Sequence, residues 1–597
     1  MQAIILAAGM GKRLKQLTKN ATKCMVEVNG VPMIDRMLFQ LEKKKLSRII
    51  MVVGYEAEKL KKHVTELGIK TPVQFVMNDI YNRTNNIYSL YLASEMLQEE
   101  DTLLLESDLI FEESILDKII ENPYPSLALV AKFERWMDGT VVTLNEENQI
   151  IGMYSKKEFD FHEVSHYYKT VNIYKFSKEF SKKQYIPFLE AYCKVLGNNE
   201  YYEQVLKIIT MLEKTELKAL RLEHEKWYEI DDIQDLDIAE SIFSKGEEKF
   251  SKMQKRYGGY WRYPEIIDFC YLVNPYYPCE KMLDEIGTNM KELICNYPSG
   301  QDVNSLLAAK YFGLRKQNIC IGNGAAEIIK ALMERVEGKV GMIYPSFQEY
   351  GNRLPADRRV IFYPTDYTYG VNDLILFFEK NAVDNIVLIN PDNPSGNYIT
   401  YKDILVLCDW CQERKIKLFI DESFADFSEE EMTLMQEEIL EQYPNLYVIK
   451  SLSKSYGMPG IRLGVMAAKD TQMISYIKKN LAIWNINSFG EFFMQILEKY
   501  EKEYRESLRL IREERNYLAE ELEKLNLKVY PSQANYIMCC LNNMSSKQLA
   551  IALLEEQNIL IKDLSEKEGF EGKNFVRIAV RNREDNQKLI ESLRKYL

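Results

Sequence analysis

A glycine-rich loop near the start of the chain places positive charge beside accessible backbone. The loop reads LAAGMGKRL over residues 6–14 and follows a short apolar segment, residues 3–6, that predicts a strand. Small side chains let backbone N–H groups approach an anion closely, and Arg13 adds a fixed positive charge. The pattern therefore predicts a phosphate-binding loop.

Acidic residues further along the chain are expected to lie near this loop. Asp108 ends the apolar stretch TLLLESD, and Asp231 lies in WYEIDDIQDL. A carboxylate at the end of a strand beside a polyphosphate is what Mg²⁺ requires, because the ion takes one or two carboxylates together with phosphate oxygens. Asp232 competes with Asp231 for this role, and the strand-end position favours Asp231. Lys23, in the segment ATKCMVEVNG, adds a further cation.

A second group of reactive residue types lies in the last third of the chain. The segment SLSKSYGMPGIRLG spans residues 451–464. Its Lys454 follows an expected strand, is flanked by serines, and precedes Arg462 by eight residues. A lysine with these neighbours is suited to form a Schiff base beside a bound phosphate. Since no histidine follows His224, this half of the chain cannot contain a Ser-His-Asp or Cys-His centre.

Further residues of the second half extend this predicted site. Asp421 ends the expected strand KLFIDES, where its carboxylate would keep a pyridinium nitrogen protonated. Gly324 opens an expected helix whose N-terminal amides can hold a phosphate. Phe347 is placed for ring stacking, and Arg577 with Arg581 offers guanidinium groups for anions on one face of a strand.

Both ends of the chain predict α/β folds with mainly parallel sheets. Near the start, two apolar strands flank a helix with apolar residues at helical spacing in PMIDRMLFQLEKKK. The alternation returns after residue 310, in NICIGNG, KVGMIYP, NIVLINP, KLFIDES and LYVIKS. The pair Gly258-Gly259 ends a charged helical stretch. We expect one domain over residues 1–250, a helical connection over 238–256, and a second domain over 257–597.

Composition excludes several classes of function. The 597 residues carry a net charge of −12, which argues against binding to nucleic acid. No apolar run approaches ~18 residues, so we expect no segment that spans a membrane. Ten scattered cysteines, and a start that lacks the order of a signal peptide, favour the reducing cytoplasm.

The N-terminal motifs resemble the sugar-nucleotidyltransferase superfamily. The resemblance rests on LAAGMGKRL, on VEVNGVP, on TNNIYSL at residues 84–90 and on the ESD and EIDD segments, and it covers roughly residues 1–245. Within the superfamily the chain is most similar to bacterial cytidylyltransferases that activate phosphocholine-type molecules. The resemblance implies a Rossmann-like domain in which a phosphate or phosphonate oxygen attacks the α-phosphorus of CTP and pyrophosphate leaves.

This resemblance implies roles for individual residues. Asp108 and Asp231 would hold Mg²⁺. The residues implied for CTP binding are Leu6, Ala8, Gly9, Gly11, Arg13, Lys23, Asn85 and Ser107, of which Arg13 and Lys23 are also catalytic. The residues expected to face the acceptor's amine or phospho group are Trp136, Asp138, Lys169 and Asn172. Ordinary packing is the alternative for Trp136 and Asn172. Asn85 and Asn86 either read cytosine or stabilise a turn.

The C-terminal motifs resemble fold-type I pyridoxal-phosphate enzymes, near the histidinol-phosphate aminotransferases and threonine-phosphate decarboxylases. The match runs from about residue 257 to the end. It implies that Lys454 forms the covalent link to pyridoxal phosphate and transfers protons, and that Arg577 binds a carboxylate. It also implies a homodimer, because Tyr297 looks like the tyrosine that reaches the neighbouring subunit's cofactor. The implied cofactor-binding residues are Gly324, Ala325, Ala326, Phe347, Asn393, Asp421, Ser451, Ser453, Lys454, Arg462 and Tyr297.

Departures from these patterns leave the reaction subclass open. Phe424 stands where aminotransferases usually have a tyrosine, three residues after Asp421. Tyr257 replaces a histidine that is usual in the decarboxylase branch. Transaminases and decarboxylases differ in which substrate bond stands perpendicular to the cofactor ring, and no motif reveals that orientation.

The order of the two halves resembles that of 2-aminoethylphosphonate cytidylyltransferase–transaminase fusions. We therefore expect transamination of phosphonoacetaldehyde to 2-aminoethylphosphonate, followed by transfer of CMP from CTP to this amine. The alternative is decarboxylation of phosphoserine to phosphoethanolamine, followed by formation of CDP-ethanolamine. A transcription regulator with an aminotransferase-like half is a third class, and the acidic chain without a basic helix-turn-helix argues against it. The amino donor, channelling between the sites and the oligomer beyond a dimer stay open.

Overall fold

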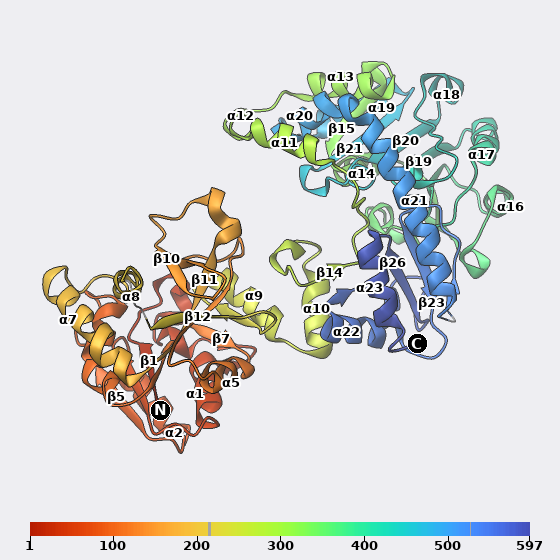
Figure 1. Ribbon diagram of the computed structural model, residues 1–597. Coiled ribbons are helices and arrows are strands. Elements are labelled where there is room, and N and C mark those ends of the chain that lie inside the picture. Colours follow the sequence, from red (N-terminus) through yellow and green to blue (C-terminus); the bar gives the residue numbers. More distant parts are fainter. Residues whose placement is uncertain (213–215, 526) are drawn as a thin grey trace. The chain divides into compact units, whose positions relative to one another are not determined.

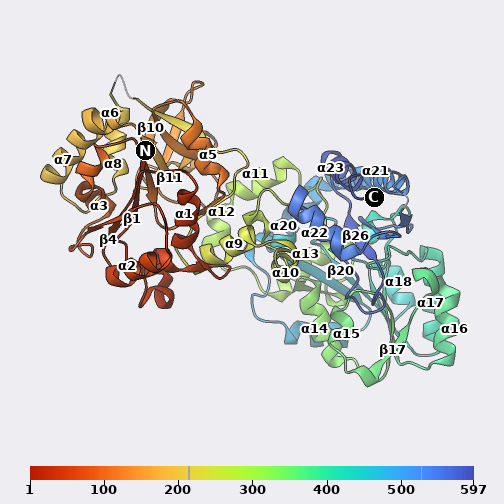
Figure 2. The ribbon, with the colours of Figure 1, turned by 90° about the horizontal axis from the view of Figure 1, so that it is seen from below.

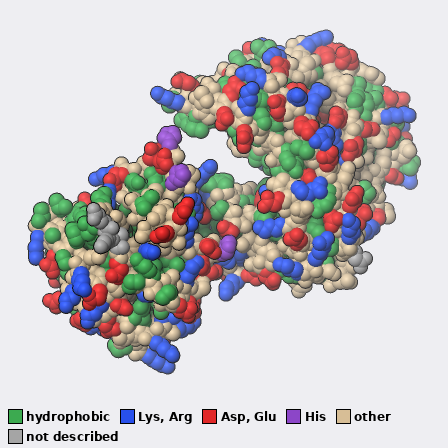
Figure 3. Space-filling model, viewed as in Figure 1, with side chains coloured by type: hydrophobic (Ala, Val, Ile, Leu, Met, Phe, Trp, Pro, Cys, Tyr) green, Lys and Arg blue, Asp and Glu red, His purple; other side chains and the backbone are tan. Residues whose placement is uncertain are grey.

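The computed structural model describes residues 1–212, 216–525 and 527–597. The chain divides into two compact units, Met1–Tyr257 and Gly258–Leu597, which are described separately. In the part of the chain that is described, no helix is long and apolar enough to cross a membrane. On the face that Figure 3 shows, acidic and basic side chains are interspersed over both units.

The first unit is built on a nine-stranded mixed sheet with a parallel centre, and not on the mainly parallel sheet that the sequence had indicated. Strand β1 (Gln2–Ala7) lies between β4 (Ile49–Val53) and β6 (Thr102–Glu106) and is parallel to both. On the other side of β6 the sheet continues with the antiparallel strand β11 (Tyr168–Phe176). The carboxyl ends of β1 and β6 therefore meet at one edge, where the glycine-rich loop and Asp108 follow.

Helices cover both faces of this sheet, as expected for a doubly wound α/β fold (Figures 1 and 2). Alternate residues of β1 point to opposite faces, and after Gln2 all of them are apolar because both faces are buried. Ile5 packs in a core with the helices α1 (Met33–Glu42), α2 (Ala57–Glu66) and α5 (Ser114–Glu121). Ile4 packs in the other core, with α3 (Asn86–Leu92), α7 (Ile186–Val195) and α8 (Glu203–Thr210).

Two helices close the first unit. They are α9 (Ile233–Phe243) and α10 (Gly246–Lys255). The helical stretch expected over residues 238–256 is thus interrupted at Ser244, whose backbone is extended.

The second unit contains a seven-stranded sheet in which the central strands are parallel. The strands β18 (Asn385–Ile389), β19 (Lys417–Asp421) and β20 (Leu446–Ser451) are neighbours. The edge-side strand β21 (Leu463–Ala468) runs antiparallel to β20. The carboxyl ends of the three parallel strands meet at one edge, so the loops carrying Asn393 and Lys454 start beside Asp421.

A smaller four-stranded sheet completes the second unit. Its central strands are β23 (Tyr536–Cys540) and β26 (Phe575–Ala579), with β22 (Lys528–Val529) and β25 (Lys562–Asp563) at the edges. The long helix α21 (Glu501–Glu523) contacts this sheet (Figure 1). The sheet carries Arg577 on β26, and Arg581 lies two residues beyond the strand's end.

Candidate functional sites

Lys23 lies at the centre of a charged network in the first unit. Its ammonium group donates to Asp108 Oδ2 at 2.5 Å and to Asp231 Oδ1 at 2.7 Å. Arg13 reaches the same oxygen of Asp231 at 2.6 Å. Burial opposes the charge on Lys23, but the two carboxylates outweigh it and raise the lysine's pKa above its ordinary value. The structure therefore brings together the predicted residues Arg13, Lys23, Asp108 and Asp231.

The two adjacent aspartates after β13 (Trp227–Glu229) have different partners. Asp232 is the N-cap of α9 and accepts hydrogen bonds from the backbone N–H groups of Gln234 and Asp235. Asp231 instead faces Lys23. The side chain of Asp232 is thus used by the helix, so the geometry favours Asp231 as the candidate metal ligand.

A third carboxylate, Glu229, was missed by the sequence analysis. Carboxylate oxygens of Asp108, Glu229 and Asp231 all lie within 4.8 Å of one another. Burial raises the pKa of Glu229, and the neighbouring Asp108 and Asp231 add to the effect against the opposing charge of Lys169. The buried Oδ1 atom of Asp108 has no hydrogen-bond partner. Hard oxygen donors with one unused buried oxygen fit a divalent cation such as Mg²⁺.

The glycine-rich loop follows β1 and turns beside Lys23. Gly11 has φ +57°, and a Cβ there would lie 3.0 Å from the Lys23 Cβ, so both conformation and space require glycine. Gly9 has nothing within 4 Å of its Cβ position, which leaves its backbone accessible. Leu6 and Ala8 are buried and place the loop against the sheet. This arrangement suits an anion that approaches the backbone.

Asn85 and Asn86 lie at the start of α3, and Ser107 directly follows β6. The side-chain oxygen of Asn85 accepts a hydrogen bond from the Asn86 backbone N–H and caps α3. Asn86 donates to Glu106 at 2.8 Å, and burial raises the pKa of that carboxyl group. Ser107 is buried. Both asparagines are therefore used structurally, which agrees with the alternative in which they stabilise a turn.

Lys169 and Asn172, which lie on β11, both face Glu229. Lys169 Nζ is 3.4 Å from Glu229 Oε2, and Asn172 donates to Glu229 Oε1 at 3.2 Å. Lys169 is only 2% exposed. Lys169 and Asn172, two of the predicted acceptor residues, thus contact the carboxylate cluster through Glu229.

Trp136 and Asp138 lie on the loop between β8 (Ser126–Lys132) and β9 (Val141–Leu144). Trp136 stacks on Tyr228 with ring centroids 4.1 Å apart and donates to Glu134. Its half-buried ring is therefore packed within the unit. Asp138 is exposed and pairs with Lys156 at 2.7 Å, so an amine ligand would compete with that lysine.

In the second unit, Lys454 lies on the loop after β20. Its backbone carbonyl accepts hydrogen bonds from Asn274 and Gly457. Burial lowers the pKa of its side chain to about 8, and the positive charges of Arg577 and Arg462 add to this effect, while Asp421 opposes it. A lysine with such a pKa presents a substantial fraction of neutral, nucleophilic amine near physiological pH.

Asp421 ends β19 and is buried. Tyr350 donates to its Oδ2 at 2.9 Å, and the hydroxyl of Ser423 donates to its Oδ1 at 2.5 Å. Burial raises the pKa of this carboxyl group against the opposing effect of these hydrogen bonds. Tyr350 and Ser423, which the sequence analysis missed, hold the carboxylate in one orientation.

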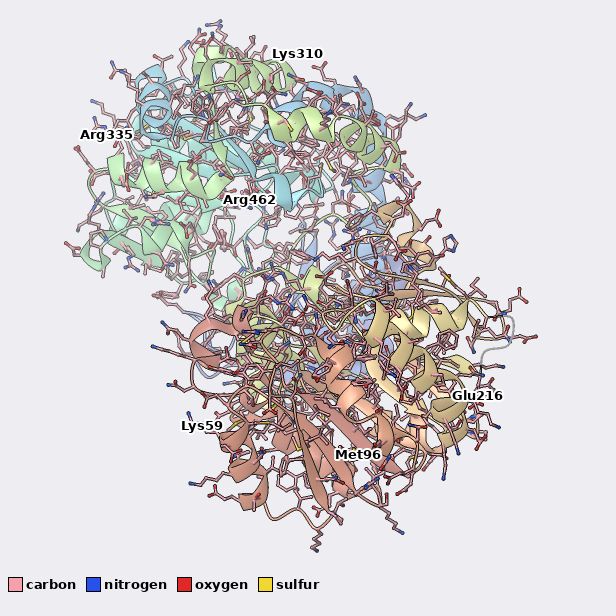
Figure 4. The ribbon with its side chains drawn as sticks, turned by 90° about the vertical axis from the view of Figure 1, so that its left-hand side faces the viewer. Lys59, Met96, Glu216, Lys310, Arg335 and Arg462 are labelled. Carbon is pink, nitrogen blue, oxygen red and sulfur yellow. The ribbon has the colours of Figure 1, made fainter. Side chains whose placement is uncertain are left out.

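Gly324 is the N-cap of α14 (Ala325–Arg335), where Ala325 and Ala326 lie in the first turn. A Cβ on Gly324 would lie 2.7 Å from the guanidinium of Arg462, and the Gly324 N–H donates to the Arg462 carbonyl oxygen. Arg462 itself is labelled in Figure 4 on the loop before β21. The hydroxyl of Ser453 is buried without a hydrogen-bond partner, and Ser451 is buried beside it in the chain.

Two aromatic residues predicted for the cofactor site are exposed. Phe347 is 40% exposed and lines a small cavity with Ser346 and Tyr350. Its ring thus lies beside the tyrosine that contacts Asp421. Tyr297 is 81% exposed and stacks on Trp484 with ring centroids 4.6 Å apart.

Arg577 and Arg581 differ in their partners. Arg577 donates to Asn393 Oδ1 at 2.6 Å and to the Cys270 carbonyl oxygen at 2.7 Å, and its buried Nε has no partner. Arg581 is paired with Asp585 at 2.8 Å. Among the described residues, Arg581 thus forms an ion pair with a carboxylate, whereas Arg577 forms none.

Phe424 is buried, and its ring packs edge-to-face on Tyr536 at 5.1 Å. Tyr536 in turn donates its hydroxyl to the Asp392 carbonyl oxygen at 2.6 Å. Position 424 is thus occupied by an apolar ring that packs on Tyr536.

Family models match both units. The "MobA-like NTP transferase domain" matches residues 3–151, and "Aminotransferase class I and II" matches residues 265–593. The latter covers more than half of the chain, and the fold and the lysine–aspartate site agree with it. The chain belongs to the class I and II aminotransferase family and carries an N-terminal nucleotidyltransferase domain, so both of its units are of enzymatic families. The family implies pyridoxal phosphate, and the orphaned Ser453 hydroxyl, Asp421 and Lys454 fit that group.

One relative aligns with nearly the whole chain. It is CMP-5'-(3-aminopropyl)phosphonate synthase of Streptomyces rubellomurinus, which is 29% identical over 99% of this chain and 94% of its own. The L-serine phosphate decarboxylase of Sulfurospirillum multivorans is 34% identical over 55% of this chain and 88% of its own.

Solved structures resemble the second unit. A decarboxylase from Sulfurospirillum multivorans matches with a TM-score of 0.52 and 31% identity, over 58% of this chain and 91% of its own. The histidinol-phosphate aminotransferase of Clostridium acetobutylicum matches with a TM-score of 0.50 and 28% identity, over 55% and 98%. A histidinol-phosphate aminotransferase and a decarboxylase are thus both among the similar structures.

Proposed function

We propose that this protein makes an aminoalkylphosphonate in its second unit and couples it to CMP in its first. The second unit transaminates phosphonoacetaldehyde to 2-aminoethylphosphonate, and the first transfers CMP from CTP to that product with release of pyrophosphate. The observation that carries the proposal is the alignment over 99% of the chain with a synthase whose product is a CMP-linked aminoalkylphosphonate. No other relative named above spans both units.

In the first unit, the chain's residues position CTP and neutralise its charge. The loop around Gly9 and Gly11 offers backbone N–H groups to the triphosphate, and Arg13 and Lys23 supply positive charge. Asp108, Glu229 and Asp231 would hold Mg²⁺, which neutralises charge that develops on the phosphate oxygens.

The acceptor of the nucleotidyl group needs one cation near its phosphono oxygens. Lys169 is buried 3.4 Å from Glu229 and thus next to the carboxylate cluster. From this position it orients the phosphono group toward the α-phosphorus of CTP without leaving a buried charge unpaired. The amine of the acceptor then points away from the cluster.

In the second unit, Lys454 accepts and returns the proton that moves at the substrate carbon. Pyridoxal phosphate supplies an electron sink when bound. Asp421, fixed by Tyr350 and Ser423, holds a proton on the ring nitrogen, which strengthens this sink. Gly324, Ser451, Ser453 and Arg462 would hold its phosphate.

A second candidate function is favoured by specific observations. Phe424 departs from the aminotransferase pattern, and an L-serine phosphate decarboxylase is 34% identical over the second unit. In that reading the second unit decarboxylates phosphoserine, and the first unit forms CDP-ethanolamine from the phosphoethanolamine produced.

A coupled reaction tests the proposal against this candidate. The purified protein is incubated with phosphonoacetaldehyde, L-alanine, CTP, Mg²⁺ and pyridoxal phosphate. We expect pyruvate and pyrophosphate to appear together and a nucleotide with a carbon–phosphorus bond to accumulate. Release of CO₂ from phosphoserine, with no pyruvate formed in the first mixture, would instead establish the second candidate.

A further inference from the structure

A buried ion pair lies directly before the loop that carries Lys454. Lys450, on β20, is 4% exposed, and its ammonium group pairs with Asp426 Oδ1 at 2.5 Å. Asp426 lies in the short 3-10 helix Ala425–Phe427, which closely follows Asp421. Burying two charges costs about as much free energy as their attraction returns, so such a pair contributes a fixed geometry more than net stability. The pair therefore joins the segment after β19 to the end of β20.

The second oxygen of Asp426 reaches the residue next to Lys454. Its Oδ2 accepts hydrogen bonds from the Ser455 hydroxyl at 2.7 Å and from the Tyr504 hydroxyl at 2.8 Å. Ser455 is fully buried, and Tyr504 lies on α21. Burial favours the neutral form of Asp426, but Lys450 and the hydrogen bonds outweigh it and lower the pKa of the carboxyl group. The carboxylate thus holds one residue on each side of Lys454.

A further residue, Asn274, holds the backbone of the same loop. Its N–H donates to the Lys454 carbonyl oxygen at 3.0 Å, and its side-chain amide donates to the Ser455 carbonyl oxygen at 2.8 Å. Asn274 is 1% exposed, and its amide also donates to Ser507 on α21 at 2.9 Å. The main chain at Lys454 is therefore fixed from outside the loop as well.

The aspartate segment (residues 421–426) and the lysine segment (residues 450–455) are linked a second time, nearer to the cofactor site. The Ser451 N–H donates to the Ser423 hydroxyl oxygen at 3.0 Å, and that hydroxyl donates to Asp421 Oδ1. With the contacts described above, the aspartate segment meets the lysine segment at both of its ends. These contacts relate the position of the lysine to that of the aspartate expected to face the ring nitrogen.

We propose that Asp426 is a positioning residue for Lys454 and that it acts through the Ser455 hydroxyl. A lysine side chain is long and flexible, so its amine is held at one place only if its backbone is fixed. Displacement of a reacting group by about 1 Å slows a reaction by up to about 100-fold. The inference rests on the part of the proposed function that gives Lys454 the covalent link to pyridoxal phosphate, and it holds for transamination and decarboxylation alike.

Two forms of the cofactor separate the position of the lysine from the integrity of the site. Pyridoxal phosphate forms the covalent link with Lys454, whereas pyridoxamine phosphate has the same ring and phosphate group and cannot form it. The full-length protein is freed of cofactor, covalent capture is timed by stopped-flow absorbance, and pyridoxamine phosphate affinity is measured by calorimetry. Ser455→Ala is expected to slow capture at least about 10-fold and to change the pyridoxamine phosphate affinity by less than about 2-fold.

Tyr504→Phe is the matched control, because it removes a hydroxyl donor from the same oxygen of Asp426. The Tyr504 ring stacks on Tyr456 with centroids 4.2 Å apart, and phenylalanine retains that contact. The lost donor belongs to α21 and not to the lysine segment. Both the capture rate and the pyridoxamine phosphate affinity should therefore stay within about 2-fold of wild type.

A second variant of Ser455 keeps the test independent of packing. Ser455→Cys has a side chain of similar size in this fully buried position, but a thiol is a weak donor. It should therefore slow capture in the same selective way, even if Ser455→Ala loses stability. With substrate in steady state, both variants should lower kcat with little change in KM, whereas Tyr504→Phe should change neither by more than about 2-fold.

The outcomes also separate this inference from the proposed function. Capture at the wild-type rate in Ser455→Ala and Ser455→Cys would overturn the positioning role of Asp426. A parallel loss of capture rate and pyridoxamine phosphate affinity would overturn it as well, because it would show a structural role only. Equal slowing in Tyr504→Phe would overturn the route through Ser455. Failure of the wild-type protein to bind pyridoxal phosphate covalently would instead contradict the proposed function of the second unit.

Discussion

The ammonium group of Lys23 lies between two carboxylates that come from distant parts of the sequence, 2.5 Å from Asp108 and 2.7 Å from Asp231. Lys23 lies in the segment after the glycine-rich loop, Asp108 lies after the end of β6, and Asp231 lies after the end of β13. Because burial alone would lower the pKa of Lys23, its raised value reflects the strength of this pairing. The pairing keeps the lysine charged and fixes the carboxylates where a divalent cation and a triphosphate would meet.

The two adjacent aspartates give a direct test of the metal site. Asp231→Asn should lower Mg²⁺-dependent pyrophosphate release at least about 100-fold, because it removes a charged metal ligand. Asp232→Asn should change it less than about 2-fold, because asparagine caps a helix as well as aspartate does. Pyrophosphate release measured over a range of Mg²⁺ concentrations distinguishes the two. A larger loss in Asp232→Asn than in Asp231→Asn would contradict the geometric assignment.

Substitution of Lys454 should separate the two activities. Lys454→Ala is expected to abolish amine exchange and the visible absorbance of covalently bound pyridoxal phosphate, because the lysine is the attachment point and the proton carrier. It should leave pyrophosphate release from CTP and a supplied acceptor within about 2-fold of wild type, since the two sites lie in different units. Loss of both activities in a folded variant would show that the two-site account is wrong.

The pH dependence of cofactor attachment should follow the lowered pKa of Lys454. The neutral amine is the nucleophile, so the rate at which the apoprotein captures pyridoxal phosphate should rise with pH through a midpoint near 8. Removing the positive charge of Arg577, as in Arg577→Gln, should move the midpoint to higher pH because it removes a cation that disfavours protonation. Stopped-flow absorbance over a pH series measures both midpoints. An unchanged midpoint in the variant would contradict the electrostatic coupling.

Two glycines of the Lys454 loop provide a matched pair for stability. Gly457 has φ +63°, and a Cβ there would lie 1.6 Å from the Tyr277 carbonyl oxygen. Gly457→Ala should therefore reduce the free energy of unfolding of the second unit by at least about 2 kcal/mol. Gly460 has nothing within 4 Å of its Cβ position, so Gly460→Ala should change it by less than about 0.5 kcal/mol. Denaturant unfolding of both variants gives the comparison.

The parts of both sites that depend on local sequence could be predicted. The expected strand at residues 3–6 is Gln2–Ala7, and the predicted helix after Gly324 is Ala325–Arg335. These elements follow from apolar patterning and from glycine at turns. The α/β class of both units, and the presence of a nucleotidyltransferase domain before an aminotransferase domain, are confirmed by the family models.

The residues that were missed depend on long-range contacts. Tyr350 reaches Asp421 across 71 positions in the sequence, and no local pattern marks a tyrosine as the partner of a distant carboxylate. Glu229 gave a weak signal, since it stands two residues before Asp231 in a strand, but its approach to Asp108 appears only in the folded chain. The helix cap at Asp232 could have been predicted, because Asp235 stands three residues later, where a capping box has its acidic residue.

The central claim is that the first unit couples CMP to an aminoalkylphosphonate. It is tested most directly by a competition in which equal amounts of 2-aminoethylphosphonate, 3-aminopropylphosphonate and phosphoethanolamine are incubated with CTP, Mg²⁺ and the protein. Phosphorus NMR separates the products, because a phosphorus bonded to carbon resonates far from one in a diphosphate ester. The account predicts that CMP-2-aminoethylphosphonate dominates from the earliest time points. Predominant CDP-ethanolamine would contradict it.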